Sequence, residues 1–479
     1  MNFYNQKVLH GFLIALAFFV FIAPAVWNGF PLVFTDSLSY LTSGVDLVAP
    51  VDRPIFYGLF IRSFNVIFDL WGAVFVQAAL VMYLLLKLSD VLFPNLSKTS
   101  SIFWLILVGL LTFAPWFVGQ LSADIFTACL FLTMIILALT SHRHPFLNSI
   151  LMCILLILEV CMHSGNLIIG LLLFAFIFIL MLMQKRAWKD IKKFSILVIA
   201  SLTIGATMIV ASNVLFKQGL TLNRWGKIIF LARVLEDGPG LQYLNKVCPE
   251  QNFKICAALP LFNEAAKQEF ALGLRNDPEL KNLVLNALLW DGGINIGGGL
   301  YALNIEATPI VLEAIKSYPL DMAYAFIKNT IDQFKTFTVG NQFGSTANLA
   351  AINTFFESNY PSLFHNYQNS KQYSDQVRPI TNAINPLYST VIFLCLPLIA
   401  AMSFFIYRYR DKKSLNFSTK SICLVIYGLA GFLIFNALIT GGISAVFGRY
   451  QSRVIWLFPA ISLLLLTQVI SNRYREPRK

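Results

Sequence analysis

Charged side chains are scarce in this chain. Asp, Glu, Lys and Arg make up only 13% of its 479 residues, whereas 57% are hydrophobic and the mean hydropathy is +0.68. A water-soluble protein of this composition has too little polar surface to cover itself. The scarcity of charge therefore excludes a soluble globular protein. Several apolar runs reach the roughly 20 residues that a helix needs to cross a bilayer, which predicts a membrane protein.

The sequence also lacks a clean alternating strand pattern and a visible internal repeat. Long apolar runs without alternation favour helices over strands. We therefore expect an all-α polytopic membrane protein with about ten transmembrane helices and a mostly helical extracytoplasmic insertion. The predicted spans cover residues 9–28, 68–87, 101–118, 122–140, 147–163, 166–184, 194–214, 387–407, 421–440 and 453–471.

No complete nucleotide-binding motif is present. The glycine-rich stretch 292–299 fits neither the dinucleotide pattern nor the P-loop pattern, and it lacks the Lys-Ser/Thr ending of the latter. We interpret it as a hinge. The net charge of +12 arises in the segments that flank the membrane, because the large loop balances its own charges. This distribution predicts orientation and contact with anionic membrane lipids, and it argues against nucleic acid as a partner.

The apolar spans divide the chain into three regions. These are an N-terminal bundle with its first outer loop (1–214), an insertion (215–386) and the C-terminal helices (387–479). Lys and Arg of the short loops gather on one side, which predicts a multi-pass protein of the cell (inner) membrane with cytoplasmic termini and an extracytoplasmic insertion. Within the insertion, we expect two amphipathic helices between Leu303 and Phe337, broken at Pro319.

The seven cysteines separate into two groups. Cys248 and Cys256 lie in the insertion, and in an oxidising compartment they can close a small disulfide loop. Two free thiols are the alternative. The other five fall within predicted spans and are expected to be packing residues: Cys129, Cys153, Cys161, Cys395 and Cys423.

The first outer loop holds the most informative acidic residue. Asp36 lies just past the first apolar run, and the same loop contains Tyr40, Arg53 and Tyr57. A carboxylate held at the outer mouth of an apolar helix bundle needs a reason, and we favour catalysis on a membrane-bound substrate. The alternative is that these residues anchor an interfacial helix.

A second acidic residue, Asp124, opens the fourth span on the same membrane face. A carboxylate at a helix N-terminus is favoured by the free N–H groups there, so capping is the alternative role. Two carboxylates at one mouth could bind a divalent cation such as Mg²⁺ or Mn²⁺, or could divide the work between a base and a residue that orients the substrate.

Glu159 and His163 are spaced i, i+4 near the outer end of the fifth span, which predicts that they share one helix face. Ionisable groups inside a span are costly and usually face the bundle interior. They could contact substrate or bind metal, or they could form a buried hydrogen bond with each other. The candidate metal ligands are thus Asp36, Asp124, Glu159 and His163.

A glycine-rich loop before the last span ends in Arg449, Tyr450 and Arg453. This position puts guanidinium groups at the level of the lipid headgroups. Arg binds phosphate through two parallel hydrogen bonds, which suits a lipid phosphate or pyrophosphate. An interfacial anchor is the alternative.

Taken together, Asp36, Asp124 and the late Arg449-Tyr450 pair resemble the C-type glycosyltransferase superfamily, whose members use lipid-linked sugar donors at the outer membrane face. The resemblance covers mainly residues 1–214 and 420–470. It implies that Asp36 is the general base and that Arg449 holds the donor phosphate. Ser37 follows Asp36 where a second acid would stand, and the chain has no Asp-x-Asp, so a metal requirement is not implied.

We therefore predict an inverting glycosyltransferase that moves a sugar from a polyprenyl-phosphate donor to a glycan, lipid or protein acceptor at the outer face. A transporter or flippase for a lipid-linked or small anionic substrate is the main alternative. It would be expected to carry charges at the bilayer midplane and paired broken helices. An acyl or phosphoryl transferase and a structural scaffold are further alternatives.

Overall fold

The computed structural model describes residues 3–140, 146–248, 250–274, 277, 279–347, 349–408 and 418–475. These residues are helical with connecting turns and contain no β-strand, apart from one isolated bridge between Leu32 and Gln120. The all-helical fold class predicted from the sequence is confirmed.

Within the described residues, seven helices are long and apolar enough to cross a membrane. All ten predicted spans coincide with helices, although the third is broken at Thr112, between α5 and α6, and the last begins within α22. The bundle helices are α1 (Phe3–Asn28), α4 (Trp71–Leu92), α5 (Lys98–Leu111), α6 (Ala114–Val118), α7 (Ile125–Thr140), α8 (Phe146–Met162), α9 (Ser164–Met183), α10 (Trp188–Leu215), α20 (Val377–Arg408), α21 (Thr419–Ile443), α22 (Gly448–Ile455) and α23 (Leu457–Arg475). Two further helices, α2 (Thr35–Asp46) and α3 (Phe56–Phe68), lie between α1 and α4.

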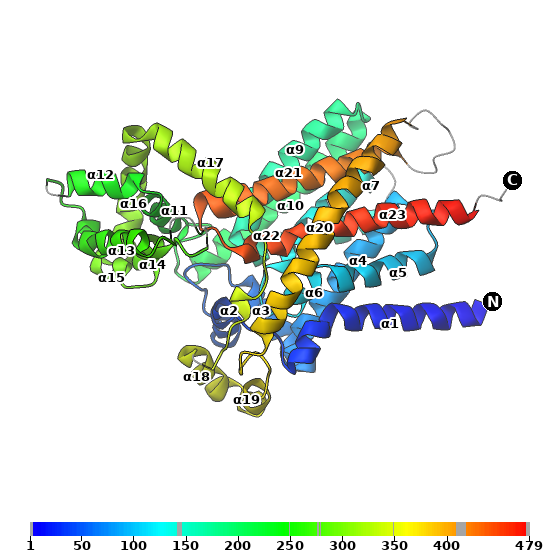
Figure 1. Ribbon diagram of the computed structural model, residues 1–479, viewed down its shortest axis with the longest axis horizontal. Coiled ribbons are helices and arrows are strands. Elements are labelled where there is room, and N and C mark those ends of the chain that lie inside the picture. The colour runs from blue at the N-terminus through cyan, green and yellow to red at the C-terminus, as the bar shows by residue number, and fades with distance from the viewer. Residues whose placement is uncertain are drawn as a thin grey trace.

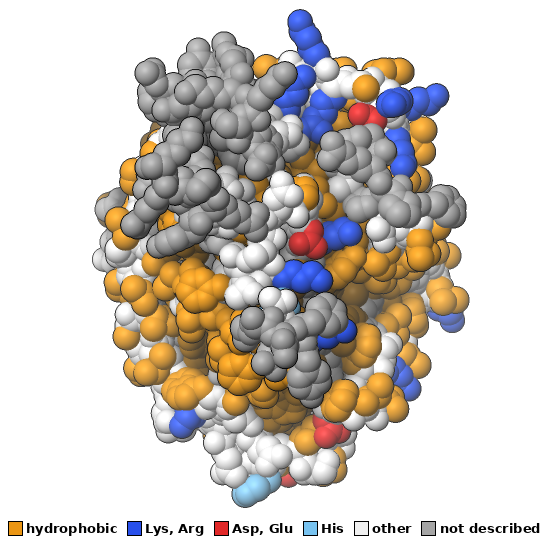
Figure 2. All heavy atoms as spheres, turned by 90° about the vertical axis from the view of Figure 1, so that its right-hand side faces the viewer, with side chains coloured by type: hydrophobic (Ala, Val, Ile, Leu, Met, Phe, Trp, Pro, Cys, Tyr) orange, Lys and Arg blue, Asp and Glu red, His pale blue; other side chains and the backbone are white. Residues whose placement is uncertain are grey.

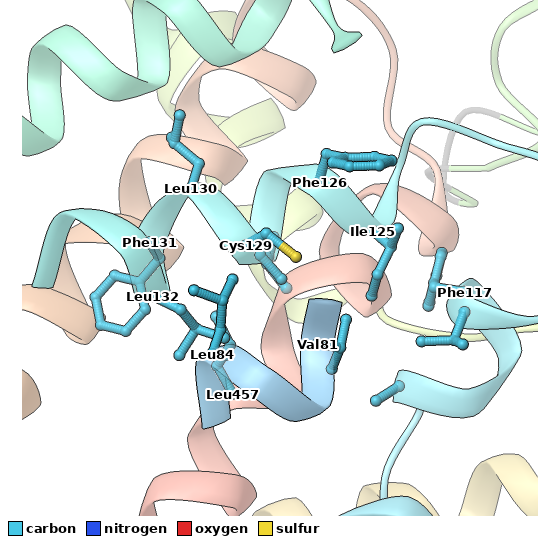
Figure 3. Close-up of a cluster of buried hydrophobic side chains, with 14 of the residues drawn as sticks. Val81, Leu84, Phe117, Ile125, Phe126, Cys129, Leu130, Phe131, Leu132 and Leu457 are labelled. Carbon is cyan, nitrogen blue, oxygen red and sulfur yellow. The ribbon is translucent and has the colours of Figure 1, made fainter. Parts of the chain in front are cut away.

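Helix α7 forms the centre of the bundle. Every one of its residues is buried, so it is hydrophobic on all sides and never meets lipid. In Figure 3, Ile125, Phe126 and Cys129 of α7 lie among side chains of α4, α6 and α23. This central helix begins directly after Asp124, and it therefore holds that carboxylate in a fixed place.

The insertion has a hydrophobic core of its own. Its buried side chains run from Ile228 to Ala314, with Ala445 as the bundle's contribution. Residues 337–377 instead pack into the core of the bundle, so the insertion predicted as one unit contributes to two cores. Its helices are α11 (Gly226–Glu236), α12 (Pro239–Val247), η1 (Lys254–Ala258), α13 (Leu259–Ala271), α14 (Leu283–Leu289), α15 (Gly293–Ile296), α16 (Gly299–Ser317), α17 (Pro319–Lys335), η3 (Asn341–Phe343), α18 (Ala350–Asn359) and α19 (Pro361–Gln368).

The break between α16 and α17 falls at Tyr318-Pro319, as predicted. The glycine-rich stretch forms the short helix α15 and the turn into α16. Gly292 and Gly298 have φ values of 96° and 88°, which side chains with a Cβ adopt only with strain.

Helix α1 begins and helix α23 ends at the end of the bundle opposite the insertion (Figure 1). Figure 2, which looks onto that end, shows more basic than acidic side chains. The arrangement agrees with termini that share one side of the membrane. That this side is cytoplasmic remains a prediction.

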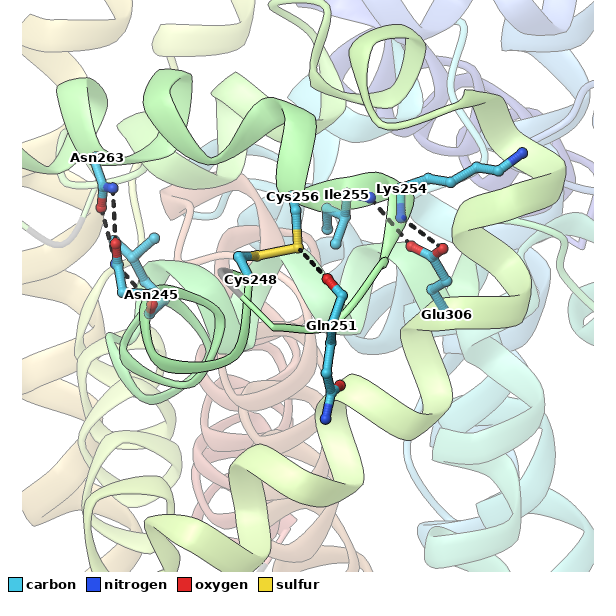
Figure 4. Close-up of a disulfide and its surroundings, with 9 residues drawn as sticks. Asn245, Cys248, Gln251, Lys254, Ile255, Cys256, Asn263 and Glu306 are labelled. Carbon is cyan, nitrogen blue, oxygen red and sulfur yellow. Dashed lines mark hydrogen bonds between the residues drawn. A yellow bond between two sulfur atoms is a disulfide. The ribbon is translucent and has the colours of Figure 1, made fainter.

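The predicted disulfide between Cys248 and Cys256 is present, with Cα atoms 5.5 Å apart (Figure 4). The backbone N–H groups of Lys254 and Ile255, next to Cys256, donate to the carboxylate of Glu306 on α16 at 2.8 and 3.2 Å. The disulfide and these hydrogen bonds fasten the α12–η1 turn to the core of the insertion.

We expect the double substitution Cys248→Ser/Cys256→Ser to lower the unfolding free energy of the insertion by about 2–3 kcal/mol, because the unfolded chain regains the entropy of a short closed loop. Thermal unfolding with and without reductant measures this effect. Cys423→Ser, at a free cysteine of α21, is the control and should respond to reductant as the parent protein does. An unchanged melting temperature in the double variant would contradict the role given to this bond.

Candidate active site

Two chain segments lie side by side to position Asp36. Leu32 N donates to Gly119 O, and Leu121 N donates to Leu32 O, both at 2.9 Å. At the start of α2, Ser37 Oγ accepts from Phe34 N at 2.9 Å and donates to Leu121 O at 2.7 Å. These bonds hold the first turn of α2 against the segment that leads into Asp124, and they bring the two carboxylates to one place.

Arg449 is positioned by residues of the insertion. The side-chain amide of Gln333, on α17, forms hydrogen bonds with both the N–H and the C=O of Phe447 at 3.0 and 2.9 Å. Gly448 N donates to Glu279 at 2.6 Å. A Cβ at Gly448 would lie 2.2 Å from Thr338 Oγ1, so only glycine fits there. The first turn of α22 is thus fixed on both sides.

Asp36 forms ion pairs with two arginines. Its Oδ2 accepts from Arg449 Nη1 at 2.9 Å, and its Oδ1 lies 3.3 Å from Arg53 Nη2. Arg53 also binds Asp52 at 2.5 Å. The Asp36 side chain stays 28% exposed and that of Arg449 14% exposed. A carboxylate from the N-terminal part of the chain therefore meets a guanidinium from the C-terminal part, and water still reaches the pair.

Aromatic rings surround these guanidinium groups. Arg449 lies 4.4 Å from the ring centre of Phe34 and 4.9 Å from that of Tyr450, and Arg53 lies 4.8 Å from that of Tyr40. A cation held over a ring face is attracted by the ring quadrupole and keeps its N–H edge free for other partners.

The two arginines determine the charge of Asp36. Burial acts to raise the pKa of this carboxyl, but the guanidinium groups of Arg449 and Arg53 outweigh burial and hold the pKa well below its usual range. Asp36 is therefore a carboxylate throughout the physiological range of pH.

A cavity of about 180 Å³ opens beside the ion pair. Seven of the predicted site residues line it: Asp36, Tyr40, Arg53, Asp124, His163, Arg449 and Tyr450. Several other residues that line the cavity were not predicted from the sequence, among them Ser164, Asn223, Trp225 and Trp290. Trp225 and Trp290 are the two tryptophans of residues 215–386. Their position in a polar region was the signal that could have identified them.

Three predicted substrate contacts do not line this cavity: Tyr57, Arg453 and Glu159. Tyr57 is fully buried, and its hydroxyl donates to Gln77 at 2.7 Å. Arg453 is 1% exposed and donates to Asp124 Oδ1 at 2.8 Å and to Asn436 Oδ1 at 3.1 Å. Tyr57 and Arg453 both point into the protein because buried polar groups must find partners, and each supports the wall of the cavity from behind.

The structure separates Glu159 from His163. Helix α8 ends at Met162, and His163 has an extended backbone and caps α9, where its Nδ1 accepts from Gly165 N. Glu159 is fully buried and accepts from Thr133 Oγ1 at 2.7 Å. The two residues therefore do not share a helix face. Only His163 lines the cavity.

The four candidate metal ligands do not form a cation site. Both carboxylate oxygens of Asp36 are paired with arginines, and Oδ1 of Asp124 is paired with Arg453. Positive guanidinium groups thus stand where a divalent cation would bind. Among the described residues, no group of three or more His, Cys, Asp or Glu side chains is placed to hold a metal ion.

The fold and the site together define a polytopic, all-helical membrane protein with a charged cavity where the insertion meets the bundle. No family model matches the sequence, and no curated protein matches it. Among solved structures, the fold is similar to the archaeal oligosaccharyltransferase AglB from Archaeoglobus fulgidus, solved in complex with an inhibitory peptide and a dolichol-phosphate. The TM-score is 0.47 at 12% identity, over 99% of this chain and 53% of that chain, so this chain spans about half the length of that protein.

Proposed function

We propose that this protein is a glycosyltransferase that moves a sugar from a polyprenyl-phosphate donor to an acceptor at the extracytoplasmic face of the cell membrane. The observation that carries the proposal is the Asp36–Arg449 ion pair, which joins a base to a phosphate-binding group at the wall of an open cavity. A proton acceptor and an anion-binding group on one cavity are what transfer from a phosphate leaving group requires.

An apolar groove beside the cavity supports a lipid donor. It has a volume of about 440 Å³, lies between α9 and α10, and is lined almost entirely by aliphatic side chains. Leu222 lines the groove, while the next residue, Asn223, lines the cavity and donates to Ser164 at 3.2 Å. Adjacent residues of the chain thus line the groove and the cavity. A polyprenyl chain in the groove would place its phosphate in the cavity.

Arg449 would hold that phosphate. It donates to Asp36 and to Tyr450, and its guanidinium has five N–H groups, so it can take a phosphate oxygen without leaving the site. Arg pairs with phosphate at two points, which fixes the orientation of the phosphate as well as binding it.

In the transfer step, the acceptor oxygen forms a bond to the anomeric carbon while the bond from that carbon to the phosphate oxygen breaks. The acceptor proton goes to Asp36, and the electron pair of the broken bond goes to the phosphate, where Arg449 stabilises it. Attack opposite the leaving group inverts the anomeric centre. The negative charge of the bound phosphate offsets part of the positive charge of Arg449, so the pKa of Asp36 rises and Asp36 becomes a stronger base.

A lipid-phosphate translocator would also use an apolar groove that leads to a charged cavity, so it is the alternative that must be tested. A comparison of two adjacent, lipid-exposed positions of α10 tests donor binding. Thr203 lines the groove and Ile204 does not. We expect Thr203→Trp to fill the groove and to weaken binding of undecaprenyl phosphate about tenfold, or about 1.4 kcal/mol, whereas Ile204→Trp binds as the parent does.

Binding is measured on the purified protein in detergent, and transfer is measured with lipid-linked sugars extracted from host membranes. Equal affinities of the two variants would contradict the assigned groove. Movement of the lipid across sealed vesicles, without any donor-dependent product, would favour the translocator.

A further inference from the structure

A second and larger cavity lies on the other side of Asp36, and we propose that it binds the acceptor and that the acceptor is a saccharide. This inference rests on the proposed glycosyl transfer. The cavity has a volume of about 710 Å³ and shares Asp36, Asp52, Arg53, Trp225 and Trp290 with the first cavity. That volume is in the range of small-molecule binding sites, which is about 300–1,000 Å³.

One wall of this acceptor cavity is a row of hydroxyl groups. Thr35, Ser39 and Thr42 are spaced i, i+4, i+7 on α2 and therefore lie on one face of the helix. Asp36 belongs to the same helix. None of the three hydroxyls has a hydrogen-bond partner within the described part of the chain, although other hydroxyls of the region, such as Ser37 Oγ, are bonded. Such a row offers donors and acceptors to a ligand that is itself rich in hydroxyl groups.

The opposite wall is a pair of tryptophans from the insertion. The rings of Trp225 and Trp290 lie 5.4 Å apart with an interplanar angle of 30°. Trp290 is 62% exposed. The indole N–H of Trp225 is buried and has no hydrogen-bond partner, which is unusual for a buried tryptophan. The exposed aromatic face of Trp290 suits a sugar ring, whose C–H face is apolar and whose edge carries hydroxyls.

The chemistry of the two walls distinguishes a saccharide from other acceptors. The larger cavity combines the α2 hydroxyls and the two tryptophans with aliphatic side chains of Leu38 and residues 48–51, whereas the groove between α9 and α10 is almost entirely aliphatic. A lipid acceptor would leave the α2 hydroxyls without partners, whereas a saccharide can present hydroxyls to α2 and its C–H face to an indole ring. Asp36 lines both cavities, so an acceptor hydroxyl in the larger cavity reaches this carboxylate while the donor phosphate remains at Arg449.

The test is the binding of fluorescently labelled, detergent-purified protein to a glycan array. We expect binding to at least one class of saccharide, weakened at least tenfold by Trp290→Ala and several-fold by Thr42→Val, which keeps the shape and removes the hydroxyl. The matched control is Trp188→Ala, because Trp188 is 64% exposed and lies at the start of α10, far from the cavity in sequence.

A second measurement separates this inference from the function on which it rests. With the bound saccharide as acceptor, Thr42→Val should raise KM more than it lowers kcat, while binding of undecaprenyl phosphate stays unchanged, because Thr42 lines only the larger cavity. If the array shows no saccharide bound, or if Trp290→Ala binds as Trp188→Ala does, the inference is wrong; donor-dependent transfer to a peptide or lipid would then leave the glycosyltransferase intact. If undecaprenyl phosphate does not bind and no product forms, the proposed function itself fails.

Discussion

Asp36→Asn is expected to lower the rate of sugar transfer by about 10²–10⁴-fold, the usual contribution of a general base. The amide keeps the shape of the carboxylate but cannot take the acceptor proton. Transfer is measured in membranes with lipid-linked donor, at expression levels matched by immunoblot. Binding of undecaprenyl phosphate should persist, because Arg449 then lacks a competing carboxylate.

The matched control is Asp46→Asn, which removes an exposed carboxylate from the last turn of the same helix. It should transfer sugar as the parent does. Undiminished transfer by Asp36→Asn, with normal folding, would remove the base role from this residue.

The charge state of Asp36 predicts how kcat/KM responds to pH. Its arginine partners lower its pKa, so the free protein loses this carboxylate only when the pH falls below the ordinary range of an aspartic acid, about 3.9. Because kcat/KM reports the groups of the free enzyme, protonation of Asp36 should not reduce kcat/KM between about pH 8 and pH 5.

Much of the fold is predictable from the sequence, because the spans depend on local composition. Apolar runs of membrane length form helices wherever they lie, and Pro319 ended α16 at the expected place. The common location of Asp36, Asp124 and Arg449 was also predictable, because each lies at the same end of a span and the topology of the spans brings such ends together.

The remaining site residues depend on contacts that have no local pattern. His163 does not share a helix face with Glu159, because α8 ends at Met162, one residue before His163. Asn166 Nδ2 donates to Glu159 O at 2.8 Å in this last turn. The side chain of Tyr57 points into the protein because its hydroxyl donates a hydrogen bond to Gln77, 20 residues away in sequence. Trp225 and Trp290 meet only when α11 and α14 pack in the insertion. Such partners cannot be read from spacing in one sequence.

Arg453→Met should destabilise the whole protein by about 3–5 kcal/mol, because it leaves the buried carboxylate of Asp124 without its main partner. Arg453 and Asp124 have side chains only 1% and 6% exposed and join α22 to the start of α7 at 2.8 Å. Arg449 is 4.0 Å from the other oxygen of Asp124 and cannot replace this bond. Thermal unfolding in detergent measures the loss of stability. Donor binding should decrease only to the extent that the protein is unfolded.

Two comparisons decide whether burial is the cause. Arg378→Met breaks an ion pair with Asp375 in which both side chains are well exposed, so it should cost less than about 1 kcal/mol. The double variant Asp124→Asn/Arg453→Met removes the stranded charge and should recover part of the stability of Arg453→Met. If Arg453→Met unfolds at the same temperature as the parent but loses donor binding, then Arg453 contacts substrate directly. The wall of the cavity must then open to expose Arg453, whose side chain is buried in this structure.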